Sequence, residues 1–353
     1  MNVWSAALAV KGRTRMSAAT GRTGAMTYDA PSTGQVLVYG ATGHTGRAVV
    51  AALSERGMSP VLAARDAVRL GELTDALGLE GRAFPVDDVP DLSGVDLVLN
   101  CAGPFADTAL PLARAAVAAG AHYLDIAAEQ PSTLALLHSL SAAAAAAGVV
   151  VMPGVAFFGG LGDLLVSALP APGDGGPWER VAIEIELSGW HPSDATLATG
   201  ERNPGARLRL SEGLLVTTDV EAPTPDDRVE LRLSEHILLS RHLPVLTLHT
   251  TVNASAIDDL ESARDLTSAQ RSLAREEQGD TFRMHAVVRR GDEQRSATIE
   301  GDDFYAVSGP LAVEVAVEVL AGRFAPGGRA PGEVPDPAAL LRRLPLSGLE
   351  LPS

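Results

Sequence analysis

Short apolar runs alternate with amphipathic stretches along the first half of the chain. An unbroken short apolar run is typical of a buried strand, and apolar residues that recur about every three or four positions are typical of a helix. The strand-like runs are residues 35–39, 61–64, 82–86, 95–100, 123–126 and 149–152. The helix-like stretches are residues 45–56, 67–77, 108–119 and 132–147. This alternation predicts a parallel sheet with helices on both faces.

The pattern changes after a Pro- and Gly-rich linker at residues 170–177. Apolar and polar residues then alternate, as they do in strands with one solvated face. These runs are residues 181–187, 214–220, 229–233, 245–252, 282–289 and 296–300. The polar stretch 255–278 predicts an exposed helix. Residues 310–320 are apolar except for a stripe made by Glu314 and Glu318, which predicts a helix buried on most faces, against the first domain.

These patterns predict an α/β fold: a Rossmann-type parallel sheet with a second, mostly antiparallel α+β domain. A chain of 353 residues is long enough for two domains. We expect four parts. They are a flexible lead-in at 1–33, the Rossmann domain at 34–169, a domain for substrate binding or dimerisation at 178–303, and a C-terminal helix and tail at 304–353 that return to the first domain.

The N-terminal residues do not predict a signal peptide. The apolar residues 3–10 precede the first cation, Lys11, which reverses the usual order of charge. Met16 and Met26 stay open as alternative starts. No apolar run is long enough to span a bilayer, so we expect a cytoplasmic protein without a membrane span.

Charge and composition exclude several classes of function. The net charge of −16 repels a phosphate backbone, so nucleic acid is not an expected partner. The single cysteine, Cys101, allows no intrachain disulfide and no thiolate zinc cluster, and the histidines have no metal-ligand spacing. The single lysine is Lys11, so the folded part offers no Schiff-base amine, no P-loop and no Tyr-x-x-x-Lys pair.

The strongest motif follows the first predicted strand and opens the first predicted helix. It reads Gly40-Ala41-Thr42-Gly43-His44-Thr45-Gly46. Gly40 permits a tight turn, Gly43 lets the backbone approach a pyrophosphate, and Gly46 lets the helix pack on the strand. The N–H groups and dipole of the helix start then face the diphosphate. In this context the motif predicts a nucleotide-binding site.

The end of the second strand selects the cofactor. Arg65 lies where a guanidinium can bind the 2′-phosphate of NADP. Asp66 is the alternative, either as the acid that binds the ribose of NAD or as the N-cap of the next helix. We favour NADP. Asp87, after the third strand, is a candidate for the adenine amine or an ordinary turn residue.

The fourth strand leads into a loop that we expect to contact the ribose and nicotinamide, because ligands bind at the carboxyl ends of such strands. Its residues are Asn100, Cys101, Ala102, Gly103, Pro104 and Phe105. Cys101 is more typical of a small buried residue than of a nucleophile. His122, Tyr123, Asp125 and Glu129 lie at or after the next strand and are candidates to donate a proton or orient a substrate, with structural roles as the alternative. We rank Tyr123 and His122 ahead of the two acids.

These motifs together resemble the saccharopine dehydrogenase-like family, which includes the trans-acting enoyl reductases. The similar segments are residues 39–47, 62–65, 98–105 and 120–125 with Glu129, and more weakly residues 305–320. The resemblance implies NADP, with Arg65 on the 2′-phosphate and the Gly103-Pro104 loop under the nicotinamide. It also implies reduction of a C=N or C=C bond, or the reverse reaction.

The resemblance weakens outside residues 35–165. Where relatives carry a Gly-Phe-Asp…Pro-x-Asp-Leu stretch, this chain keeps Asp163 and Leu164, and residues 180–300 match no pattern of the family. We therefore expect an NADP-dependent oxidoreductase acting on a small molecule of unassigned identity. A homodimer through the second domain is a candidate assembly. The alternative function is a non-catalytic NADP-binding sensor or partner protein.

Overall fold

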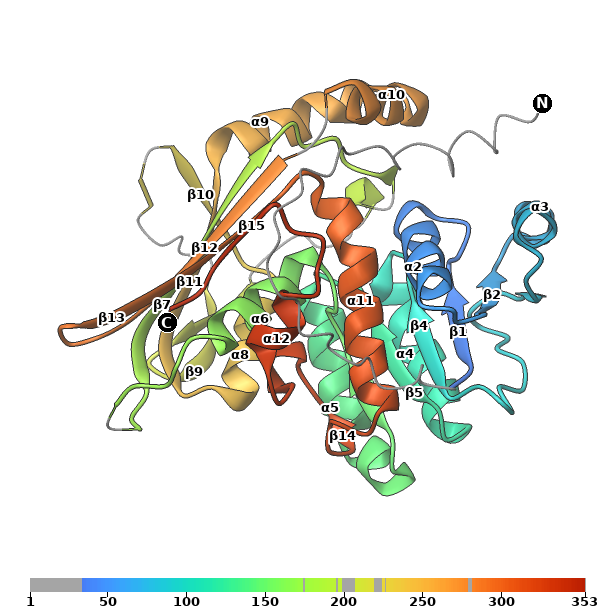
Figure 1. Ribbon diagram of the computed structural model, residues 1–353, viewed down its shortest axis with the longest axis horizontal. Coiled ribbons are helices and arrows are strands. Elements are labelled where there is room, and N and C mark those ends of the chain that lie inside the picture. Colours follow the sequence, from blue (N-terminus) through green and yellow to red (C-terminus); the bar gives the residue numbers. More distant parts are fainter. Residues whose placement is uncertain are drawn as a thin grey trace, which may run out of the picture. The chain divides into compact units, whose positions relative to one another are not determined.

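The first sheet has seven parallel strands among the described residues, in the order β14-β6-β5-β4-β1-β2-β3 (Figure 1). The computed structural model describes residues 34–352 except 174, 195, 199–206, 219–223, 226 and 279–280; the predicted lead-in lies outside them. The strands are β1 Val36–Tyr39, β2 Val61–Ala64, β3 Gly81–Ala83, β4 Leu97–Asn100, β5 His122–Asp125, β6 Val150–Met152 and β14 Gly327–Gly328. The next two strands in the sequence, β2 and β3, lie on one side of β1 and β4 lies on the other, so the strand order reverses between β1 and β4. In sheets of this kind a ligand binds in the crevice at this point, outside the carboxyl ends of the strands. The predicted Rossmann-type sheet is confirmed.

Helices cover both faces of this sheet because alternate side chains of each strand point to opposite sides. Val36 and Val38 belong to the core shared with α2, α3 and α11, whereas Leu37 and Tyr39 belong to the core shared with α4 and α5. The helices are α2 His44–Glu55, α3 Ala67–Leu77, α4 Phe105–Ala118 and α5 Gln130–Ala147. α3 has its predicted bounds, but α4 begins at Phe105 rather than at residue 108, because Pro104 already caps it.

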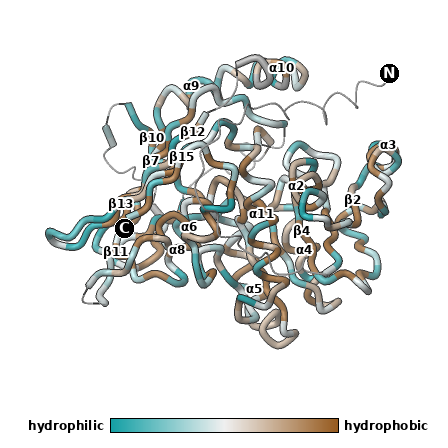
Figure 2. Tube along the Cα trace, viewed as in Figure 1, coloured by the Kyte–Doolittle hydropathy of each residue, from teal (hydrophilic) through white to brown (hydrophobic). Residues whose placement is uncertain are grey.

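The second sheet has the order β10-β11-β7-β12-β13-β15. Its strands are β7 Trp178–Ser188, β10 Arg228–Leu231, β11 Val245–Asn253, β12 Thr281–Arg290, β13 Glu293–Gly301 and β15 Gly348–Glu350. Every pairing is antiparallel except β11 with β7, so the mostly antiparallel prediction is confirmed. The tip between β12 and β13 is hydrophilic (Figure 2).

Several short elements beside this sheet differ from the prediction. β8 Arg207–Ser211 pairs with β9 Leu214–Thr218 in a separate hairpin, and residues 219–220 of the predicted strand lie outside the described part. The predicted helix 255–278 is divided into α9 Ala254–Ser262, a short turn, and α10 Ser268–Gln278. The division falls at Thr267, whose side-chain hydroxyl accepts from the N–H of Gln270 and starts a new helix.

The C-terminal residues join both sheets. α11, Phe304–Leu320, begins six residues before the predicted start at 310, because Asp303 accepts from the N–H groups of Tyr305 and Ala306 and caps it. Asp303 is therefore the N-cap of α11. After α11 the chain adds β14 to the first sheet and β15 to the second. The C-terminal residues, which we expected to return to the first domain, thus also add a strand to the second sheet.

α11 packs tightly against α2 and is mostly hydrophobic (Figures 1 and 2). A Cβ at Gly309 would lie 2.8 Å from the backbone of Ala48, so glycine is required for this approach. The polar stripe is buried as ion pairs rather than solvated. Glu314 pairs with Arg343 at 2.6 Å and also with Arg56. No helix of the described residues is both long and apolar enough to cross a bilayer.

Two short helices absent from the prediction support the turn at residues 157–161. They are α6 Gly162–Ser167 and α8 Glu235–His242. Glu235 of α8 is fully buried, and its Oε1 accepts from the N–H of Gly159 at 2.7 Å. Gly159 has a φ of +101°, which favours glycine. Burial raises the pKa of Glu235 to about 7, with a smaller upward contribution from Asp163.

Glu235→Gln should change how the free energy of unfolding depends on pH. Between its unfolded pKa of 4.5 and its folded pKa of about 7, Glu235 keeps a proton in the folded state that the unfolded chain has lost. The wild type therefore loses stability as pH rises through this window. An uncharged Gln avoids that loss, so the stability of the variant relative to wild type should rise up to about pH 7 and then stay level. Urea denaturation at a series of pH values measures it, and a difference independent of pH would contradict the assignment.

Candidate functional site

The turn between β1 and α2, residues 40–46, forms a cradle at the carboxyl edge of the first sheet; we call it the glycine turn. Gly40 has a φ of +82°, and a Cβ there would lie 2.8 Å from the backbone nitrogen of Ala102. A Cβ at Gly46 would collide with the carbonyl of Gly40, whereas one at Gly43 would meet that carbonyl at 3.2 Å and otherwise face open space. No side chain of the described residues caps α2. The helix start can therefore hold a diphosphate, as the motif predicts.

Three arginines lie near the adenosine end that this turn implies. Arg65 follows β2 and is exposed, and Arg69, in the first turn of α3, lines the cavity beside the glycine turn. Burial lowers the pKa of Arg47, and the charge of Arg69 lowers it further, so these two guanidinium groups are neighbours. Arg69 was missed from the sequence because it stands inside a helix, outside any motif, whereas Arg47 ends the similar segment 39–47 but was given no role. Together the arginines create a positive region that suits a phosphate.

Asp66 and Asp87 have distinct surroundings. Asp66 Oδ1 accepts from the N–H groups of Val68 at 3.0 Å and Arg69 at 3.1 Å, so it is the N-cap of α3. Asp87 lies near the phenol of Tyr39. The pKa of Tyr39 is raised mainly by burial, lowered by Arg65 and raised by Asp87, which places both charges beside that ring.

Three buried side chains form a hydrogen-bonded network under the carboxyl ends of β4 and β5. Asn100 donates from Nδ2 to the hydroxyl of Tyr123 at 3.0 Å, and that hydroxyl donates to Asp125 Oδ2 at 3.0 Å. Asn100 Oδ1 accepts from Ala102 N–H at 2.9 Å. Asp125 Oδ1 accepts from the N–H groups of residues 127 and 154, each at 3.0 Å. The network therefore positions three loops that follow strands.

The structure places the predicted proton donors His122, Tyr123 and Asp125 in β5. None of these three residues lines the cavity. His122 is at the amino end of β5, where its Nδ1 accepts from Val150 N–H at 2.9 Å. Tyr123 is fully buried, and burial, with Asp125, raises its pKa well above the ordinary value. Burial likewise raises the pKa of Asp125 to about 7. The hydrogen bonds that the structure gives these three side chains are made within the fold.

A cavity of about 510 Å³ lies over the glycine turn. Its first-domain lining comes from the predicted cofactor residues and from Glu129. These residues are Thr42, Gly43, His44, Thr45, Cys101, Gly103, Phe105 and Glu129, with Arg69. Gly40, Gly46, Ala102 and Pro104 shape the turns but do not line the cavity, and neither do Arg65 and Asp87.

Glu129 is the one candidate donor that the structure brings to the cavity. It is 6% exposed, precedes α5, and accepts from Phe105 N–H at 3.4 Å through Oε1. Cys101 also lines the cavity, but burial, with Asp125, raises the pKa of its thiol well above the ordinary value. A thiol with a raised pKa is a poor nucleophile. The raised pKa of the thiol therefore fits the predicted role of Cys101 as a small buried residue better than a role as a nucleophile.

The opposite wall comes from residues that sequence reasoning missed. Tyr305, at the start of α11, accepts from Ser193 N–H at 3.3 Å, hydrogen-bonds Thr196 Oγ1 at 3.2 Å and meets the ring of His44 edge-on at 5.4 Å. Arg271 of α10 is 6% exposed and pairs with Asp194. Phe157, Phe158 and Phe304 complete this wall. Tyr305 begins the segment 305–320, which resembles the family only weakly, and the other segments carry no motif that could have identified these residues.

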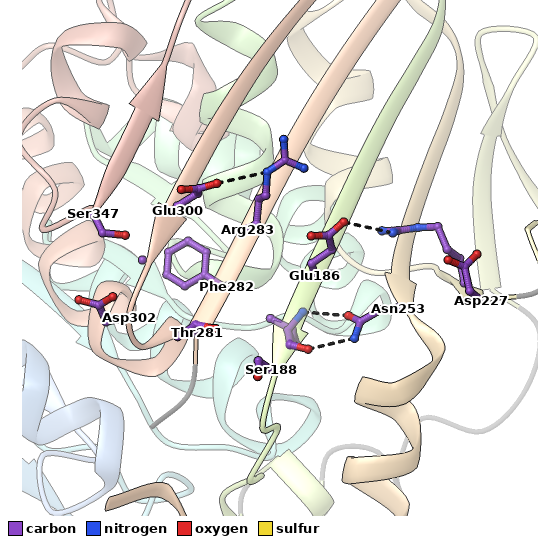
Figure 3. Close-up of a pocket in the computed structure, with 13 residues that line it drawn as sticks. Glu186, Ser188, Asp227, Asn253, Thr281, Phe282, Arg283, Glu300, Asp302 and Ser347 are labelled. Atoms are coloured by element: carbon purple, nitrogen blue, oxygen red, sulfur yellow. Dashed lines mark hydrogen bonds and ion pairs between the residues drawn. The ribbon is translucent and has the colours of Figure 1, made fainter. Parts of the chain in front are cut away.

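A second cavity, of about 570 Å³, lies at one end of the second sheet (Figure 3). Two ion pairs lie among its lining residues: Arg283 with Glu300 at 3.3 Å and Arg228 with Glu186 at 3.9 Å. None of its lining residues belongs to the first sheet or its loops. No cluster of three His, Cys, Asp or Glu within the described residues is arranged to hold a metal ion. We therefore assign the functional site to the cavity at the glycine turn.

Comparison with known proteins agrees with this assignment. Residues 36–152 match the family model of the saccharopine dehydrogenase NADP binding domain. Apo saccharopine dehydrogenase (L-Glu forming) from Saccharomyces cerevisiae has a TM-score of 0.57 and 14% identity, over 91% of this chain and 100% of that chain, which shows a shared fold. The C. glutamicum DAP dehydrogenase in complex with DAP has a TM-score of 0.48 and 15% identity, over 88% and 96% of the two chains. No curated protein has a significantly similar sequence.

The matched residues run from β1 to the end of β6. They include the glycine turn, Arg65, the loop after β4 and Glu129. The fold outside them, with its second sheet, is also that of saccharopine dehydrogenase. Residues 36–152 therefore match the NADP binding domain of saccharopine dehydrogenase, and the chain shares the fold of that enzyme.

Proposed function

We propose that this protein is an NADP-dependent oxidoreductase that reduces a C=C or C=N bond of a small molecule. The observation that carries the proposal is one cavity that joins the glycine turn to the buried Glu129 and to a wall that includes Arg271, Phe304 and Tyr305 from outside the first domain. The reduced cofactor, when bound, supplies a hydride. A pure nucleotide-binding protein needs no such second wall. NADPH oxidation with a panel of enones and imines tests the proposal, and NADPH binding without any turnover would favour the sensor function instead.

Residues of this chain bind the phosphates of the cofactor, position its nucleotide and provide the proton. The start of α2 and the arginines near Arg65 bind the phosphates, and the loop at Gly103 positions the nucleotide. Glu129 is the proposed source of the proton for the carbon or nitrogen that is reduced, because it is a buried carboxyl at the cavity beside Gly103 and Phe105. A positioned acid of this kind contributes about 10²–10⁴-fold to a rate.

The cofactor preference should depend on arginine. NADPH should bind at least about tenfold tighter than NADH, since a charge-assisted hydrogen bond to phosphate contributes about 1.5–3 kcal/mol. Arg65→Ala should remove most of this preference, and Arg69→Ala should weaken it. Arg114→Ala, on the exposed side of α4, is the matched control and should leave it unchanged. Fluorescence titration of both nucleotides measures the effect, and equal affinities in wild type would contradict the assignment.

Two glycine substitutions should separate binding from folding. Gly43→Val should abolish NADPH binding in a folded protein, because the new side chain enters the space beside the helix start where the pyrophosphate belongs. Gly46→Val should instead destabilise the fold, because the Cβ of the new side chain would already collide with the carbonyl of Gly40. Circular dichroism melts and NADPH titration measure the two effects. Wild-type affinity in Gly43→Val would refute the role of the glycine turn.

Turnover should depend on Glu129 and not directly on Tyr123. Glu129→Gln should slow turnover by about 100-fold or more while NADPH affinity stays unchanged. Tyr123→Phe should retain turnover but lose about 1–3 kcal/mol of stability, because Asp125 and Asn100 each lose a buried partner. Steady-state kinetics and urea denaturation of both variants measure this. Near-wild-type turnover in Glu129→Gln would show that water or another group provides the proton.

A further inference from the structure

The aromatic residues of this chain are concentrated at one place. The chain has only seven Phe and four Tyr in 353 residues. Four Phe and one Tyr nevertheless line the cavity at the glycine turn. Phe105 lies on the first-domain side, and Phe157, Phe158, Phe304 and Tyr305 form the opposite side, which we call the aromatic wall. Packing of the core does not require this, because Leu, Val and Ala fill most of it.

The aromatic wall is held by contacts between its own rings. Phe157 and Phe158 meet edge-to-face with centroids 5.0 Å apart, and Phe304 and Tyr305 lie 4.3 Å apart at an interplanar angle of 34°. Trp190 supports the wall from behind, 5.6 Å from the ring of Phe158. Rings at these separations attract each other and restrict each other's rotation. The wall is therefore a prepared apolar surface.

The charges around the wall are already paired within the protein. Arg271 is the cation that lines this end of the cavity in the described part of the chain, and Asp194 pairs with it. Its Nη1 also donates to the carbonyls of Ala263 and Leu266. Its Nε is buried without a partner among the described residues. Arg271 therefore offers a substrate one N–H donor and not the two parallel donors of a bidentate pair with a carboxylate.

We propose that this site takes an uncharged substrate whose reducible C=C or C=N bond is conjugated to a flat apolar group that packs on the aromatic wall. The inference rests on the proposed function and names the class of substrate for it. Aromatic surface favours planar partners because offset stacking and edge-to-face contacts add to the burial of apolar area. A dicarboxylate amino acid would leave its charges unpaired here.

The test compares two uncharged enones and one dianion. Benzylideneacetone carries a phenyl ring on its double bond, ethylideneacetone is the same enone without the ring, and fumarate is a dicarboxylate with a C=C bond. Calorimetric titration into protein loaded with oxidised NADP, and into protein without nucleotide, gives each affinity. Benzylideneacetone should bind at least about tenfold tighter than ethylideneacetone, and fumarate should bind most weakly.

Variants at Phe158 connect this preference to the aromatic wall. Phe158 is only partly buried, so Phe158→Leu should fold. It should reduce the preference for benzylideneacetone about tenfold or more, Phe158→Tyr should keep it, and NADPH affinity should not change in either. Phe324→Leu, a buried phenylalanine outside the cavity, is the matched control.

The two proposals fail in different ways. Ethylideneacetone or fumarate binding as tightly as benzylideneacetone, or an unchanged preference in Phe158→Leu, would overturn the aromatic substrate class while leaving NADPH binding intact. A protein that binds no NADPH would overturn the proposed function, and the titration without nucleotide would still test the wall.

Discussion

The site depends on the buried network that joins Asn100, Tyr123 and Asp125 under the carboxyl ends of β4 and β5. Each side chain is fully buried, and each has hydrogen bonds to the others or to the backbone of a loop. A buried polar group that loses its partner costs several times what a satisfied hydrogen bond contributes. The three side chains therefore favour one arrangement. That arrangement places the loop after β4, with Cys101, and the loop after β5, with Glu129, at the same cavity.

α11 couples this network to the rest of the chain. Gly309 lets it lie directly against α2, and its first residues, Phe304 and Tyr305, reach the cavity from the other side. Apolar residues of the first sheet, α11 and the second sheet form one continuous core. The three expected parts that the structure describes, from residue 34 onward, thus share one core and are not independent. A cavity lined by both sheets' loops keeps its shape because the same core supports both walls.

The cofactor side of the site could be predicted from short stretches of sequence, but the substrate side could not. The glycine turn is recognisable because a tight turn, a close approach and a helix start all require particular residues within seven positions of one another. Tyr123 lies in the predicted strand 123–126 and His122 directly before it; both are part of β5, and neither lines the cavity. Arg271 lies outside any motif, and Tyr305 begins the segment 305–320 that resembles the family only weakly; both meet the glycine turn only in three dimensions.

The sequence by itself determined the parallel sheet, its helices, the mostly antiparallel second sheet and the nucleotide-binding turn, because periodicity and glycine chemistry act over short stretches of chain. Tertiary structure alone decided which acid faces the cavity and that five aromatic rings gather at one site. It also decided that the C-terminal residues complete both sheets. These outcomes follow from contacts between residues far apart in the chain, where packing and burial, rather than local pattern, set the free energy.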